Sequence, residues 1–69
     1  MELSEREKLL IDCLQYHKIE METIKGIMIM LMERPVGQNL LIQYLTSTKE
    51  LTEDDIVSKT EEIIDKMMD

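Results

Sequence analysis

Apolar and weakly polar residues recur at alternating spacings of four and three along residues 4–33, the pattern of a coiled-coil helix. This heptad stripe consists of Leu10, Leu14, His17, Met21, Ile24, Met28 and Leu31. A helix of about 30 residues is about 45 Å long, whereas a compact domain of this size is only about 28 Å across. We therefore expect the helix to extend beyond its own domain and to need a second chain to cover its stripe.

The ends of this first helix are marked by local signals. Ser4 and Glu7 have the S-x-x-E spacing of a capping box, in which each side chain accepts a hydrogen bond from the other residue's backbone N–H. Pro35 disfavours helical geometry in the residue before it. The sequence predicts one helix over about residues 4–33. Two helices joined by a hinge at Gly26 are the alternative, since glycine costs a helix about 1 kcal/mol relative to alanine.

Two shorter helices follow the first. Asn39 is a candidate N-cap for a short second helix over about residues 39–46. Thr52 and Asp55 have the spacing of another capping box, which predicts a third helix over about residues 52–68. The apolar residues of this third helix recur every three or four positions and form one face. They are Ile56, Val57, Thr60, Ile63, Ile64, Met67 and Met68.

The predicted fold is all-α, a single helical domain over residues 1–69 in which three helices pack as a small bundle completed by dimerisation. A core of this size supplies only about 3–5 kcal/mol without a disulfide, a metal or oligomerisation. Cys13 is the only cysteine, so no disulfide can form within one chain. Association with a second copy is the simplest remaining source of stability, and we predict a homodimer.

We expect the two chains to meet along the heptad stripe. The predicted self-association residues are Leu10, Leu14, His17, Met21 and Ile24. Residues 27–32 are apolar on every side of the helix, so we expect them to be enclosed by the other helices of the chain or by a partner that takes the place of those helices. This run is far shorter than the about 20 residues needed to cross a membrane. With one cysteine and no hydrophobic leader, the chain is expected in the cytoplasm.

The charge of the chain restricts its partners. Fifteen acidic residues and eight basic residues give a net charge of −7. Nucleic acids and anionic lipids are bound through Lys and Arg, so we expect neither direct nucleic-acid binding nor membrane binding. A protein partner with a basic surface is compatible, although a solvated, well-capped helix accounts for the same acidic residues without a ligand. The candidate residues for such a partner are Glu53, Asp54, Asp55, Glu61, Glu62 and Asp65.

The sequence contains no recognisable catalytic motif. Glycine-rich phosphate loops, H-E-x-x-H and G-x-S-x-G are absent. Cys13 and His17 are one helical turn apart and would meet their counterparts in a symmetric dimer, where they offer sulfur and imidazole to a metal ion. A lone histidine within a heptad stripe more often fixes the register through a hydrogen bond. We therefore expect no enzymatic activity and no cofactor.

These observations predict a small acidic helical protein that acts by protein–protein interaction, through self-association along the heptad stripe and without catalysis. One alternative is an acidic inhibitor or regulator, from a mobile element or another source, which binds a basic groove of a larger nucleic-acid-processing protein. A second alternative is a metal or redox sensor at Cys13 and His17.

Overall fold

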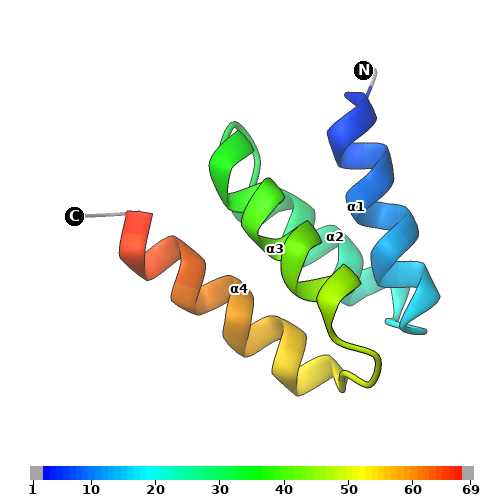
Figure 1. Ribbon diagram of the computed structural model, residues 1–69. Coiled ribbons are helices and arrows are strands. Elements are labelled where there is room, and N and C mark those ends of the chain that lie inside the picture. Colours follow the sequence, from blue (N-terminus) through cyan, green and yellow to red (C-terminus); the bar gives the residue numbers. More distant parts are fainter. Residues whose placement is uncertain (1–2, 68–69) are drawn as a thin grey trace.

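The computed structural model describes residues 3–67, which form four helices and no strands (Figure 1). The helices are α1 (Glu5–Tyr16), α2 (Met21–Met30), α3 (Pro35–Ser47) and α4 (Glu53–Met67). α3 lies between α1 and α4, and α2 lies behind α3 in the figure and contacts both α1 and α4. The predicted all-α class is confirmed, with four helices in place of three, while dimerisation stays a prediction.

The predicted single helix over residues 4–33 is wrong, although its start is as expected. The Glu7 N–H donates to Ser4 Oγ at 3.1 Å, and the Ser4 N–H donates to Glu7 Oε1 at 2.9 Å, which completes the capping box. The helix nevertheless ends at Tyr16, and another begins at Met21 after a sharp turn. The chain therefore measures 29 × 28 × 21 Å and contains no rod of the expected length among its described residues.

We call the turn between α1 and α2, residues 17–20, the first corner. The Ile19 N–H donates to the Leu14 carbonyl at 3.3 Å. The Lys18 N–H donates to the Gln15 carbonyl at 2.9 Å. Together these bonds form the Schellman pattern that ends many helices. Lys18 supplies the left-handed residue of the pattern, with a φ of 60°, a conformation that costs residues other than glycine about 1–2 kcal/mol.

Burial of Ile19 offsets the strain at the first corner. Its side chain is only 8% exposed and belongs to the same core cluster as Leu14. Gly26, the alternative hinge, lies inside α2, and nothing lies within 4 Å of the position that a Cβ would take there. The chain thus turns where an isoleucine can enter the core, and the helix continues through its glycine.

α2 and α3 are joined by a β-turn at residues 31–34, which we call the second corner. The Arg34 N–H donates to the Leu31 carbonyl at 3.0 Å, and Glu33 is left-handed with a φ of 61°. The Leu31 carbonyl also accepts a hydrogen bond from Nε2 of the buried Gln38, at 2.8 Å. The end of α2 is therefore tied to the first turns of α3.

The second helix was predicted over residues 39–46, but α3 begins earlier, at Pro35. Proline suits the first position of a helix, because its fixed φ is helical and the N–H that it lacks would have no partner there. The predicted N-cap role of Asn39 is wrong. Its Oδ1 instead accepts a hydrogen bond from Arg6 Nε at 2.8 Å, which links α3 to α1.

The predicted start of α4 is confirmed. The Thr52 N–H donates to Asp55 Oδ2 and the Asp55 N–H donates to Thr52 Oγ1, both at 3.1 Å. The structure describes α4 as far as Met67, so the predicted end at Met68 lies outside the described residues. The buried residues of its apolar face are Ile56, Thr60 and Ile63.

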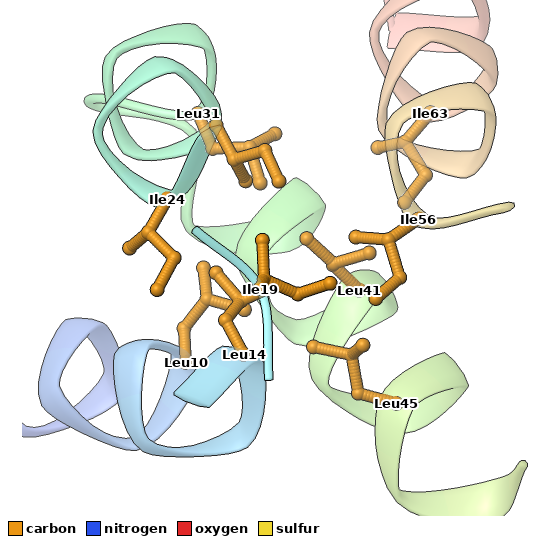
Figure 2. Close-up of a cluster of buried hydrophobic side chains, with 10 residues drawn as sticks. Leu10, Leu14, Ile19, Ile24, Leu31, Leu41, Leu45, Ile56 and Ile63 are labelled. Carbon is orange, nitrogen blue, oxygen red and sulfur yellow. The ribbon is translucent and has the colours of Figure 1, made fainter. Parts of the chain in front are cut away.

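Side chains from all four helices and from both corners meet in one hydrophobic core (Figure 2). Burial of each such side chain stabilises the fold by about 1.5–3 kcal/mol. Four residues of the heptad stripe belong to this core. The stripe is therefore covered largely by the chain's own helices. The core consists of Leu10, Leu14, Ile19, Ile24, Ile27, Leu31, Leu41, Leu45, Ile56 and Ile63.

α3 and α4 cross closely at Gly37, which is buried in the first turn of α3. A Cβ at this position would lie 3.0 Å from Met67 Sδ, 3.1 Å from Leu31 Cδ2 and 3.3 Å from Ile63 Cγ2. A larger residue would have to displace these side chains. The glycine therefore sets the distance between α3 and α4 next to the second corner.

Candidate interaction surfaces

Three of the five predicted self-association residues are buried within the chain. Leu10 and Leu14 are 0% exposed, and Ile24 is 2% exposed. His17 is half-buried, whereas Met21 exposes 51% of its surface. The three buried residues therefore contact the chain's own helices. Met21 is the member of the predicted set that leaves a large apolar area open to a partner.

His17 connects the first corner to the end of α3. Its Nε2 donates to the Leu45 carbonyl at 3.0 Å, one of the last carbonyls of α3, which have no partner within the helix. The Tyr16 ring stands edge-on to the His17 ring, with 5.4 Å between the ring centroids, and is 79% exposed. Tyr16 and Met21 thus lie on either side of the first corner as large exposed side chains, and we call this pair the first-corner surface.

A second apolar area surrounds the second corner. It comprises Ile29, Met32 and Val36, which are 67%, 50% and 61% exposed, and we call these three residues the second-corner surface. The other helices of the chain therefore enclose only part of residues 27–32, and enclosure of the rest by a partner stays a prediction. α2 packs by the side that carries Ile24 and Ile27, and Ile29 on another side stays in solvent.

Three of the six acidic residues proposed for partner binding meet in one groove. Glu61, Glu62 and Asp65 of α4 line a groove of about 650 Å³ between α4 and α2. Its apolar lining comes from Met30 and Ile64. A groove that combines carboxylates with apolar side chains is complementary to a basic amphipathic helix.

The other three acidic residues have structural roles at the start of α4. Glu53, Asp54 and Asp55 occupy its first turn, where the helix dipole stabilises negative charge. Asp55 completes the capping box, and Glu53 Oε1 accepts a hydrogen bond from Thr23 Oγ1 of α2 at 3.0 Å. Of the six predicted acidic residues, three therefore stabilise the start of α4 and three line the groove.

Within the groove, Glu62 is paired with two lysines of α4. Its Oε1 lies 3.1 Å from Lys66 Nζ and 3.7 Å from Lys59 Nζ. The hydrogen bond to Lys66, and then the charge of Lys59, lowers the pKa of the Glu62 carboxyl below its ordinary value of 4.5. These lysines offset the charge of Glu62, so Glu61 and Asp65 are the main source of negative potential at the groove.

Cys13 and His17 line a different groove, of about 380 Å³, between α1 and α3. Burial of the thiol, and then the charge of Asp12, raises the pKa of Cys13 above its ordinary value of 9.0. A thiol that stays protonated is a poor nucleophile and a poor metal ligand. Among residues 3–67, no three His, Cys, Asp or Glu side chains are grouped so that they could hold a metal ion. The metal or redox interpretation gains no support from this geometry.

No protein-family model, curated protein or solved structure matches this chain. Within the described residues, each helix is too short or too polar to cross a membrane. The two corner surfaces and the acidic groove are the features of this chain that indicate a function.

Proposed function

We propose that this chain is a small acidic interaction protein that associates with a second copy of itself and has no catalytic role. The observation that carries this proposal is the first-corner surface, where Tyr16 and Met21 are exposed on a chain with a small core. Both residues lie within residues 10–24, where the heptad pattern predicts contact between chains. Covering them with a second copy removes apolar surface from water and adds to the stability of each chain.

We further propose a cytoplasmic location. Cys13 is the only cysteine, so no disulfide within the chain supports the fold. A protein of this kind does not depend on an oxidising compartment for its fold.

The test of self-association is the mass of the protein, measured by light scattering from micromolar to millimolar concentration. We expect the mass of one chain at the dilute end and of two chains at the concentrated end. Met21→Glu places a charge within the first-corner surface and should raise the dimer dissociation constant at least about tenfold. The matched variant Ile29→Glu places the same charge on the second-corner surface and should leave the constant unchanged.

Two results would contradict this proposal in different ways. A single-chain mass at every concentration overturns self-association itself. A loss of dimer in Ile29→Glu alone places the contact at the second corner. Because both positions are exposed, far-UV circular dichroism should show native helix content in each variant, which separates a lost contact from a lost fold.

The groove between α2 and α4 supports a second candidate function, an acidic regulator that binds a basic segment of a larger nucleic-acid-processing protein. Glu61 and Asp65 provide the charge, and Met30 and Ile64 provide the apolar contact. A synthetic helical peptide of lysine and leucine should bind with an affinity that falls as salt rises. Glu61→Gln with Asp65→Asn should abolish this binding, whereas Glu53→Gln with Asp54→Asn should not. Equal binding by both double variants contradicts this function.

A further inference from the structure

The first corner has the properties of a hinge at which α1 can separate from the rest of its chain. Lys18 holds a left-handed φ of 60° without being a glycine, which is a strained conformation. Residues 17–20 contain neither proline nor glycine, so their chemistry also permits a helix. The heptad pattern continues through the corner from Leu14 to Ile24. The closed corner and a straight helix are therefore two conformations open to the same segment.

We propose that two copies of this chain exchange α1 across straightened first corners. This inference rests on the proposed self-association and names its route. In the exchanged dimer residues 17–20 are helical, α1 and α2 form one helix, and α1 of each chain packs against α3 of the other. A helix over residues 5–30 is about 39 Å long. The folded chain measures 29 Å in its longest direction, so straightening carries α1 out of its own core.

The contacts that hold α1 can form equally well between two chains, because they join α1 to residues beyond the hinge. Arg6 Nε donates to Asn39 Oδ1 of α3 at 2.8 Å. Leu10 and Leu14 are fully buried in the core that α1 shares with the other helices. Exchange rebuilds these contacts with the other chain's α3. Straightening gives up the corner position that buries Ile19 and releases the backbone strain at Lys18. Strained hinge loops favour exchange for this reason.

Exchange also brings the two first-corner surfaces together. In the exchanged dimer, α1 of one chain ends next to the start of α2 of the other chain, where the corner lies in the single chain. The two straightened hinges therefore run side by side in opposite directions. Tyr16 and Met21 flank each hinge and are exposed in the single chain. Met21 belongs to the heptad stripe of each straightened helix, so the dimer covers it between its two long helices.

The second corner cannot open in this way and provides an internal control. Glu33 has a left-handed φ of 61°, nearly the same as that of Lys18. Pro35 follows it, and proline both lacks the N–H that a continuous helix needs and clashes with helical geometry in the residue before it. Relief of strain at this corner therefore does not change the balance between single chains and exchanged dimers.

The first test compares Lys18→Gly with Glu33→Gly by light scattering. At position 18, glycine relieves the left-handed corner and disfavours the helical hinge, so the dimer dissociation constant should rise at least about tenfold. Glu33→Gly should leave the constant within about twofold of the wild-type value. Equal effects of the two variants overturn the exchange.

The second test asks which chain α1 packs against. In a Cys13→Ser background, Arg6→Cys and Asn39→Cys place one thiol on α1 and one on α3, at positions that are hydrogen-bonded in the folded chain. A short bismaleimide then bridges the two thiols, and the products are separated on a denaturing gel. At concentrations where light scattering shows dimers, exchange predicts covalent two-chain products. At dilute concentrations it predicts bridges within single chains.

The outcomes separate this inference from the proposed function. Dimers that give only bridges within single chains overturn the exchange and leave self-association in place. Single chains at every concentration overturn both. Since Arg6 and Asn39 are exposed, the substituted chain should keep its helix content, and circular dichroism checks this before the bridging reaction.

Discussion

At the first corner the chain reverses around Lys18, and at the second it reverses around Glu33, each in a left-handed conformation without a glycine. The first corner is a Schellman pattern stabilised by burial of Ile19. The second is a β-turn stabilised by a hydrogen bond from Gln38 and followed by Pro35. Both corners bury an apolar side chain, Ile19 at the first and Leu31 at the second, and the second also has a buried polar bond and a proline.

This difference explains why only one reversal can be recognised in the sequence. Proline restricts its neighbours whatever the rest of the chain does, so Pro35 places the second corner within a few residues. The first corner depends on a space in the core that α3 and α4 help to form, far along the chain from Ile19. A local pattern carries no information on that space.

The largest expected difference is between the buried Ile19 of the first corner and the half-exposed Met32 of the second. Ile19→Ala should lower the free energy of unfolding by about 2–4 kcal/mol, because it leaves a cavity in the core. Met32→Ala, at the second corner, should change it by less than about 0.5 kcal/mol because Met32 is half exposed. Urea denaturation followed by circular dichroism measures both values. Similar losses would mean that burial is not what holds the first corner.

For polar side chains we expect a smaller difference, and here the substitution near the second corner should lower the free energy of unfolding more than the one at the first. Gln38→Met removes a buried donor to the Leu31 carbonyl and should destabilise the chain by about 1–2 kcal/mol. His17→Leu removes the half-buried bond to the Leu45 carbonyl and should cost about 0.5–1 kcal/mol. The same denaturation experiment gives the ranking. A larger loss in the His17 variant would show that the first corner also depends on its polar bond.

The smallest effect is expected midway between the corners. Gly26→Ala should raise the free energy of unfolding by about 0.5–1 kcal/mol, since alanine favours a helix and the added methyl group has open space around it. Thermal denaturation should show a higher midpoint for the variant. A decrease in stability would indicate that the chain uses Gly26 as a hinge after all.

The parts of the fold that the sequence predicted correctly are those made by neighbouring residues. The capping boxes at Ser4 and Thr52 involve partners three positions away, so their spacing is visible in the sequence. The apolar face of α4 follows from helical periodicity in the same way. Asn39 shows the limit of such reasoning, because its partner Arg6 is distant in the sequence and no spacing rule connects the two.

The candidate surfaces were predicted only in part. Sequence reasoning identified Met21 and the groove residues Glu61, Glu62 and Asp65, since charge and periodicity are local properties. It did not identify the second-corner surface. Whether an apolar residue of α2 is covered depends on which side of that helix packs, and α2 is apolar on both sides near its end.

The contact between the rings of Tyr16 and His17 gives the first corner its own spectroscopic signal. The chain has no tryptophan, no phenylalanine, one histidine and two tyrosines, so its aromatic proton spectrum is simple. Ring currents depend on how two rings face each other, and the edge-on arrangement at 5.4 Å depends on the backbone at the corner. Tyr44 lies elsewhere, with Lys59 Nζ 5.4 Å from its ring, and serves as the reference. Opening of the corner can thus be followed by proton resonance in the unlabelled, unmodified chain.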